Sequence, residues 1–455
     1  MTSLTTLLPA AAGTGAFPHA HSRSAALHER ARAVMPGGNT RHSVFFPPYP
    51  VYATHGRGSR IWDADGVERI DCMNNYSSLI HGHGHPAIVE AIQQQATRLT
   101  SVALPTESEI ELAELLVERL DAIEQIRFCN SGTEAMLFAI KAARAYSGRP
   151  VIAKVEGAYH GSAETAAVSS QPGPSRWGPA DSPASVPDAG STPGVAADVV
   201  VLPMNDVDNG RRILRGVGSR LAAVVLDPLV KNLGFKPVTQ EFLQMVREEL
   251  QACGGLLVFD EVYSLRLGFH GAHATLGVQP DIIAMGKIIG GGLPIGAIGG
   301  RADIMTALFD PHAGARLGHA GTFNANPLTM AAGLAAMRAF DLGAFERLSA
   351  LGDRLRKGLR EALRIADVEG TVTGATSMTG FFLSGKSMSN YREIAALMGA
   401  DPTIARRAEH VFHHLLNHGV YMGSYGFFVL STAITEAEVD YIAETTLAAL
   451  RTLPT

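Results

Sequence analysis

The sequence predicts an α/β protein, with a large domain built on a mostly parallel sheet wrapped by helices and a smaller α+β domain drawn from both ends of the chain. The first observation is that helical stretches alternate with short, continuous apolar runs from about Ile88 to Leu342. The runs read IRFCN, VIAKV, VVVLP, AAVVLD, LLVFDEV, DIIAMG and IGAIGG. Parallel strands covered on both faces show this texture, and such domains bind ligands at the carboxyl ends of their strands. The second observation is that the parts of the chain before Ile88 and after Leu342 lack this alternation of helical stretches and continuous apolar runs.

Composition limits the class of protein. The 455 residues are 46% hydrophobic, which allows two or three domains at about 150 residues each. With 38 basic and 43 acidic residues scattered along the chain, the net charge of -5 gives no reason to expect nucleic acid or a membrane surface as a partner. The three cysteines form no CxxC pair, and no apolar run reaches the roughly 18 residues of a membrane-spanning helix. We therefore expect a soluble, cytoplasmic protein.

The distribution of apolar runs and of Pro, Gly, Ser and Ala divides the chain into four parts. We expect a flexible leader at residues 1–22, an N-terminal segment of the small domain at 23–75, the large domain at 76–342 and the C-terminal small domain at 343–455. Within the large domain, residues 162–197 are dense in Pro, Ser, Gly and Ala. A loop of this length inside a compact domain is typical of a lid or a disordered insertion, and its position directly after the sequence GAYHG favours a lid.

The flanking segments predict a helix, a hairpin and an α+β layer. A helical pattern at Ser24–Val34 stops at a Pro-Gly-Gly cluster, and the residues between Val51 and Cys72 alternate around an Asp-Gly turn at 65–66. The C-terminal part predicts helices and strands at Phe345–Ala366, Gly380–Leu383, Arg406–Asn417, Gly426–Ser431 and Glu436–Leu450.

Two strand ends carry reactive side chains. Asp260 ends the run LLVFD, and a carboxylate buried there needs a cation or a donor as partner. Lys287 ends the run DIIAMG, where burial can lower the pKa of the amine and so make it a nucleophile that forms Schiff bases. Taken alone, Asp260 is more typical of a helix cap or half of an ion pair, and Lys287 is more typical of a solvated residue at a strand end.

A third strand end resembles an anion site. The run IRFC leads into Asn130-Ser131-Gly132-Thr133, after which a periodic helix begins. Free N–H groups in the first turn of that helix, with the Ser and Thr hydroxyls, form a phosphate cradle, although a capping box from Ser131 to Glu134 explains the same residues. A phosphate cradle, a buried carboxylate and a buried lysine at one sheet edge together match pyridoxal phosphate, which needs a phosphate anchor, an acid for its ring nitrogen and an amine for its aldehyde.

The motifs around these residues resemble a known family. From about Arg30 to Leu450 the chain is similar to class-III aminotransferases of fold type I, in the branch of glutamate-1-semialdehyde aminomutases and β-amino-acid (β-phenylalanine) aminotransferases. The resemblance rests on the motifs NSGTEA (Asn130–Ala135), GAYHG (Gly157–Gly161), FDEV (Phe259–Val262), GKIIGGGLPIGAIGG (Gly286–Gly300) and GTFNANPLTMAAG (Gly321–Gly333).

This resemblance implies roles for the residues around the cofactor ring. Lys287 would form the Schiff base and, once freed by substrate, move the proton between the substrate carbon and the cofactor. Asp260 would pair with the pyridinium nitrogen. Tyr159 would stack on one face of the ring and Val262 pack on the other, while Asn232 would approach the ring hydroxyl.

The resemblance also implies a dimer. Ser131, Gly132 and Thr133 would bind the cofactor phosphate, and Thr322 would reach the phosphate of the cofactor in the neighbouring subunit. The enzyme would then be a homodimer with two shared active sites.

Some positions concern the substrate, and others depart from the family pattern. Arg41 matches an arginine of the β-amino-acid enzymes, and an arginine can bind a substrate carboxylate with two parallel hydrogen bonds; a surface arginine after a turn is the alternative. Tyr425 stands where those enzymes carry a second arginine. Asp227 replaces a glutamate, and Lys231 a small residue, which leaves the geometry around Asn232 open.

We therefore expect a pyridoxal-phosphate aminotransferase that moves an amino group from an amine or β-amino acid to a keto acid by a ping-pong mechanism. An intramolecular aminomutase is the first alternative, and a non-catalytic cofactor-binding protein is the second. No metal site is expected, because the alternating histidines of HGHGHP have no acidic or Cys partner nearby in the sequence.

Overall fold

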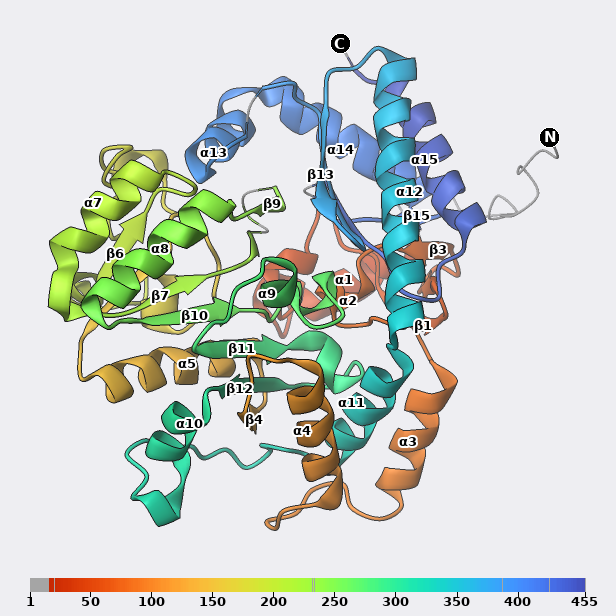
Figure 1. The fold of residues 1–455 in the computed structure, drawn as a ribbon. Coiled ribbons are helices and arrows are strands. Elements are labelled where there is room, and N and C mark those ends of the chain that lie inside the picture. Colours follow the sequence, from red (N-terminus) through yellow and green to blue (C-terminus); the bar gives the residue numbers. More distant parts are fainter. Residues whose placement is uncertain are drawn as a thin grey trace. The chain divides into compact units, whose positions relative to one another are not determined.

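The computed structural model describes residues 16–19, 21–230, 232, 234–386, 388–424 and 426–454 (Figure 1). The chain forms two compact units. The central unit contains residues 86–345 and 386–400, and the terminal unit contains the described residues up to 85 together with 346–385 and 401–454. Lys231, Tyr425 and most of the expected leader lie outside the described residues.

The central unit is built on one seven-stranded sheet. Its strands follow the order β4 (Gln125–Cys129), β12 (Gly296–Gly300), β11 (Ile282–Gly286), β10 (Leu256–Asp260), β7 (Leu221–Leu226), β5 (Val151–Val155) and β6 (Val199–Leu202). Each apolar run of the sequence is one of these strands. The sheet is mostly parallel, as expected, but β12 runs antiparallel to both β11 and β4. The connection from β11 to β12 contains only a short 3-10 turn, whereas a parallel return needs a crossover of about a dozen residues or more.

Helices cover this sheet because their apolar residues have a strand surface to bury. Helix α5 (Gly132–Ser147) packs on β4, β7, β10, β11 and β12, and its alanine-rich face joins the main hydrophobic core (Figure 1). Helix α8 (Gln240–Cys253) packs on β7 and β10, and α7 (Val207–Val217) on β6 and α8. Helices α3 (Pro86–Ala96), α4 (Glu107–Arg119) and α11 (Pro327–Ala339) form a second group, in which α11 packs against both α3 and α4.

The segment expected to be a lid has a defined conformation within the central unit. It contains the short helix α6 (Glu164–Ala167), and its Ser169 N–H donates to the Val186 carbonyl at 2.8 Å. The buried Lys154 of β5 holds the start of the segment: its Nζ donates to the Ala166 and Val168 carbonyls at 2.9 and 2.6 Å.

The terminal unit joins both ends of the chain in one sheet. Strands β2 (Arg60–Asp63) and β3 (Glu68–Asp71) form the hairpin expected around the Asp-Gly turn. Strand β1 (Ala53–Arg57) extends it to an antiparallel meander, and β15 (Val420–Tyr421) adds to β3 in parallel. A second sheet contains β13 (Thr371–Ala375), β14 (Met378–Phe382) and β16 (Phe427–Val429). The helices are α1 (Arg23–Arg32), α12 (Leu342–Ala366), α14 (Pro402–Asn417) and α15 (Glu436–Leu450).

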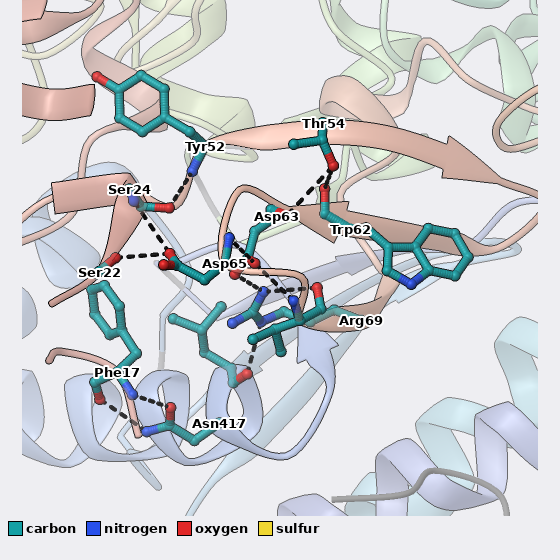
Figure 2. A network of polar contacts seen from close by, with 12 residues as sticks. Phe17, Ser22, Ser24, Tyr52, Thr54, Trp62, Asp63, Asp65, Arg69 and Asn417 are labelled. Carbon is teal, nitrogen blue, oxygen red and sulfur yellow. Dashed lines mark hydrogen bonds and ion pairs between the residues drawn. The ribbon is translucent and has the colours of Figure 1, made fainter. Parts of the chain in front are cut away.

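Polar contacts fix the hairpin to both ends of the chain within this unit (Figure 2). The Asp65 carboxylate at the turn accepts from the Ser22 hydroxyl at 2.8 Å and from the Arg23 N–H at 2.6 Å, which anchors the start of α1. The buried Arg69 donates to Asp63 at 2.6 Å and to the Leu416 carbonyl of α14 at 2.9 Å. The hairpin turn and β3 are thus tied to residues from both termini.

Within the described part of the chain, no single helix is long and apolar enough to cross a membrane. Only α11 and α12 taken together pass a test of length and composition, and they meet at a bend of 73°.

Candidate active site

The three strand ends selected from the sequence lie at the same edge of the central sheet. Strands β10 and β11 are parallel neighbours, with Asp260 opposite Ala284, so Asp260 and Lys287 follow the carboxyl ends of adjacent strands. Strand β4 points the same way, because β12 is antiparallel to both β4 and β11. The carboxyl ends of parallel strands are where such sheets bind ligands.

Asp260 is a buried carboxylate with two donors. Its Oδ1 accepts from the Val262 N–H at 3.0 Å, and its Oδ2 pairs with Nδ1 of His160 at 2.8 Å. Burial lowers the pKa of His160, and the bond to Asp260 opposes this effect only in part. A neutral imidazole then donates its Nδ1 proton to the carboxylate. Nε2 of His160 is buried and has no hydrogen-bond partner among the described residues.

A second buried carboxylate lies near this pair. Asp227 follows β7, and its Oδ1 accepts one bond, from the Leu229 N–H at 3.0 Å. Burial, with the charge of Asp260 in the same direction, raises the pKa of Asp227 well above its ordinary range, although the positive charge of Lys287 opposes this. Two neighbouring carboxylates cannot both ionise cheaply in a buried place. The raised pKa favours the protonated form of Asp227, which accepts fewer hydrogen bonds than Asp260.

Lys287 begins a 3-10 turn in a strained conformation. Its φ is +50°, a region that non-glycine residues rarely occupy and that occurs preferentially at functional sites. Its Nζ lies 4.7 Å from the centroid of the Tyr263 ring. Helix α11 supports the turn at close range: a Cβ on Gly291 would meet the Ala332 carbonyl oxygen at 2.4 Å, so only glycine fits there. The backbone that carries the amine is therefore held rigidly.

The start of α5 provides an anion site. The Ser131 hydroxyl caps the helix by accepting from the Glu134 N–H at 3.1 Å, as the capping-box interpretation expects. The return bond differs, since Glu134 accepts from the N–H of Asn130 at 2.6 Å rather than from that of Ser131. A Cβ on Gly132 would meet Cγ1 of Val262 at 2.5 Å, so the glycine lets this helix end lie directly against the residues after Asp260. Backbone N–H groups at such an end attract phosphate.

The remaining candidate residues of the central unit differ in exposure. Tyr159 is 56% exposed. Nδ2 of Asn232 donates to the Gly157 carbonyl at 3.1 Å, which places Asn232 beside the turn that leads to Tyr159. The Ser162 N–H approaches Oγ1 of Thr133 at 3.4 Å, which joins that same loop to the start of α5. Thr322 is exposed.

Arg41, the candidate substrate residue, belongs to the terminal unit. It is exposed, and its Nη1 donates to Oδ1 of Asn75 at 2.8 Å. Among the described residues, no group of three or more His, Cys, Asp or Glu is arranged to hold a metal ion; His83 of the HGHGHP stretch pairs with Asp71 at 2.8 Å.

Sequence reasoning missed three groups at or near this sheet edge. His160 sits next to Tyr159 in the GAYHG motif, and its place after a buried strand was a usable signal. Asp227 was seen only as a departure from a family pattern. Lys154 interrupts the apolar run VIAKV, and burial lowers its pKa to about 7. Its Nζ is bound to three backbone carbonyls and to the Ser170 hydroxyl.

The residues at this sheet edge suit pyridoxal phosphate. The N–H groups and hydroxyls at the start of α5 match a phosphate, and the Asp260 anion matches a protonated ring nitrogen. Lys287, at the end of the adjacent strand, supplies an amine. The donor set contains the chemical groups that the cofactor requires.

Known proteins agree with this assignment. The glutamate-1-semialdehyde 2,1-aminomutase 2 of Geobacillus kaustophilus is 36% identical over 440 residues, covering 95% of this chain and 99% of that protein. An omega-transaminase from Sphaerobacter thermophilus superposes with a TM-score of 0.90 at 46% identity, covering 95% of this chain and 98% of that one. A β-phenylalanine aminotransferase from Variovorax paradoxus gives a TM-score of 0.82 at 35% identity, covering 94% and 92%.

These structures confirm the expected fold type I. The family model for class-III aminotransferases matches residues 44–450. The chain therefore belongs to the class-III aminotransferases and is an enzyme that uses pyridoxal phosphate to transfer amino groups.

Proposed function

We propose that this enzyme transfers the amino group of a β-amino acid or a related amine to a keto acid in two half-reactions at one site. The observation that carries the proposal is the position of Lys287 and Asp260 at adjacent strand ends, beside a helix start suited to phosphate. When bound, pyridoxal phosphate supplies an aldehyde for the amine and a ring that withdraws electrons from the reacting carbon.

Lys287 is the group that carries the cofactor covalently. With the cofactor bound, Nζ of Lys287 would be the base that moves the proton between the substrate carbon and the cofactor. Its attachment to a strained, tightly packed turn supports this role, because proton transfer needs a base held within hydrogen-bond distance.

Asp260 and His160 act as a pair. The Asp260 carboxylate holds the ring nitrogen protonated, and the neutral His160 orients that carboxylate through its Nδ1–H bond of 2.8 Å. Tyr159 and Val262 would contact the two faces of the bound ring, and Asn232 would approach its hydroxyl. The role of Val262 is supported by its contact position against Gly132.

The phosphate group is held by Ser131, Gly132 and Thr133 of one subunit and by Thr322 of a second copy. Exposed apolar side chains support a homodimer: Phe323, next to Thr322, is 59% exposed, and Leu104 of the same unit is 73% exposed. A second copy whose phosphate site is reached by Thr322 would cover Phe323, the next residue along the chain. Shared active sites would explain why Thr322 is exposed in the single chain.

Arg41 binds the carboxylate of the substrate. The Variovorax paradoxus relative, a β-phenylalanine aminotransferase, supports a β-amino acid as the donor that carries this carboxylate.

An intramolecular aminomutase is the second candidate. It is favoured by curated relatives of that activity at 36–40% identity, whereas the structures at 46% and 35% identity are a transaminase and an aminotransferase. A purely cofactor-binding role is disfavoured because the chain keeps both the candidate base Lys287 and the acid Asp260.

The test is the absorption spectrum of the purified holoenzyme during addition of single amines. The panel contains 3-amino-3-phenylpropanoate, 1-phenylethylamine, alanine and glutamate. We expect 3-amino-3-phenylpropanoate to bleach the band of the bound cofactor and a keto acid to restore it. A band that no external amine changes would favour the aminomutase, and a protein that binds no cofactor would contradict the whole proposal.

A further inference from the structure

The terminal unit contains a cavity of about 310 Å³ whose walls are mainly apolar and aromatic. Arg41 and Asn75 line it together with Val44, Trp62, Met73 and Tyr421. The pocket lies within this one unit and contains both polar and ionisable groups. Its chemistry therefore depends on how those charges are compensated.

The two carboxylates in the pocket wall already have partners. Asp63 accepts from Arg69 at 2.6 Å, and Asp71 pairs with His83 at 2.8 Å while also accepting from the Met73 N–H at 2.8 Å. Neither is available to a further cation. Both carboxylates of the pocket wall therefore form hydrogen bonds and ion pairs within the fold.

Arg41, unlike the two carboxylates, has no ion-pair partner among the described residues. Its guanidinium donates to the neutral amide oxygen of Asn75 at 2.8 Å, and no ion pair within 4.0 Å includes it in the described part of the chain. A guanidinium presents five N–H donors, and one bond leaves most of them for a ligand. An amide fixes the direction of the guanidinium without cancelling its charge. The result is a cation oriented at an apolar pocket, which is the arrangement that binds a carboxylate.

The backbone that presents Asn75 is unusual. Asn74, Asn75, Tyr76 and Ser77 have φ values of 46°, 46°, 55° and 74°, so four successive non-glycine residues are left-handed. Such residues are strained and persist only where the surroundings enforce the conformation. The enforcing contacts are the bonds from Nδ2 of Asn74 to the Asp71 and Val429 carbonyls, at 3.0 and 2.8 Å, and the bond from the Tyr76 hydroxyl to the Ser43 carbonyl.

We propose that Asn75 is a specificity-determining positioning residue: it holds Arg41 as an oriented, uncompensated cation, so that the pocket selects donors with a carboxylate on an apolar or aromatic body. The proposal rests on the role of Arg41 in the proposed function and extends it. The left-handed turn presents the Asn75 amide oxygen to Nη1 of Arg41. An acidic residue at position 75 would instead satisfy Arg41 internally and close the site to carboxylates.

The test replaces the amide with a carboxylate of the same size. Asn75→Asp keeps a residue type that tolerates the left-handed region, so the turn is expected to survive. Transamination is measured with 3-amino-3-phenylpropanoate and with 1-phenylethylamine, an amine that lacks the carboxylate. We expect KM for the acid to rise about 10- to 100-fold, with kcat and the KM for the amine changed by less than about threefold.

Two further variants separate the contact from general effects. Asn75→Gly removes the amide but suits a positive φ even better, and it is expected to raise KM for the acid about three- to tenfold. Asn39→Asp adds the same charge at another position in the pocket wall, where Asn39 donates to the Gly37 carbonyl rather than contacting Arg41. Its effect on the acid is expected to be several-fold smaller than that of Asn75→Asp.

Arg41→Ala distinguishes failure of this inference from failure of the proposed function. If it leaves KM for the acid unchanged, the proposed role of Arg41 is wrong. If it raises that KM while Asn75→Asp does not, Arg41 binds the carboxylate but Asn75 does not position it. An equal rise for acid and amine in Asn75→Asp, or an effect of Asn39→Asp as large as that of Asn75→Asp, also overturns the inference.

Discussion

The sheet edge of the central unit and the pocket of the terminal unit differ in the partners of their charged side chains. At the sheet edge, the Asp260 carboxylate receives two hydrogen bonds, and the buried amine of Lys154 is held by carbonyls and a hydroxyl. In the pocket, Arg41 has a neutral amide as its hydrogen-bond partner. The charged groups at the sheet edge are held by the fold, whereas Arg41, the proposed substrate-binding cation, has a neutral hydrogen-bond partner.

The two regions also differ in their backbone. Asp260 and Lys287 follow the ends of regular strands whose positions are set by the buried sheet. Arg41 precedes a short 3-10 turn, and Asn75 lies in a left-handed turn. Loops on a rigid scaffold commonly carry specificity, because they can change without disturbing the core.

The largest expected effect tests the sheet edge. Asp260→Asn preserves the shape of the side chain but removes its charge, so the ring nitrogen loses its counter-ion and electron withdrawal weakens. We expect kcat to fall about 10²- to 10³-fold for carboxylate and neutral donors alike, measured by steady-state transamination with cofactor content followed by absorbance. A loss confined to carboxylate donors would contradict the division between the two regions.

Much of the central unit could be predicted from the sequence, because a buried strand between helices leaves a direct apolar signature. The runs that end at Asp260 and Lys287 are strands, and the helix after Ser131 begins where its capping serine indicates. The antiparallel direction of β12 was not visible, since an apolar run carries no information about strand direction. His160 was missed because its role depends on a contact with Asp260, 100 positions away.

The terminal unit was less predictable for a physical reason. Nothing in the sequence NNYS announces four left-handed residues, because the bonds that enforce them come from residues far along the chain, such as Val429. Arg41 was found through family resemblance rather than pattern. A specificity site on loops depends on tertiary contacts, which periodicity does not report.

The smallest expected effect concerns acid stability and involves one histidine of each unit. Burial lowers the pKa of His319 in the central unit and of His414 in the terminal unit to about 4. Between about pH 6.5 and about pH 4, these two histidines bind protons in the unfolded chain but not in the folded chain. The free energy of unfolding therefore falls as the pH falls through that window. Above about pH 6.5 neither histidine contributes to the slope.

The variants His319→Asn and His414→Asn are therefore expected to lose less of their free energy of unfolding than the wild type when the pH is lowered. Both side chains are partly exposed, so we expect about 1 kcal/mol or less from each between pH 7 and 4.5, measured by urea unfolding. Equal acid slopes in the wild type and both variants would show that these histidines are protonated alike in the folded and unfolded chains.

The most direct test of the central claim is to locate the cofactor on the chain. Reduction of the holoenzyme with sodium borohydride fixes the cofactor to the amine that carries it, and peptide mass spectrometry then identifies that lysine. We predict modification of Lys287 and none of Lys154, although burial lowers the pKa of Lys154 to about 7. Modification of Lys154 or another lysine, with Lys287 unmodified, would contradict the account of the active site.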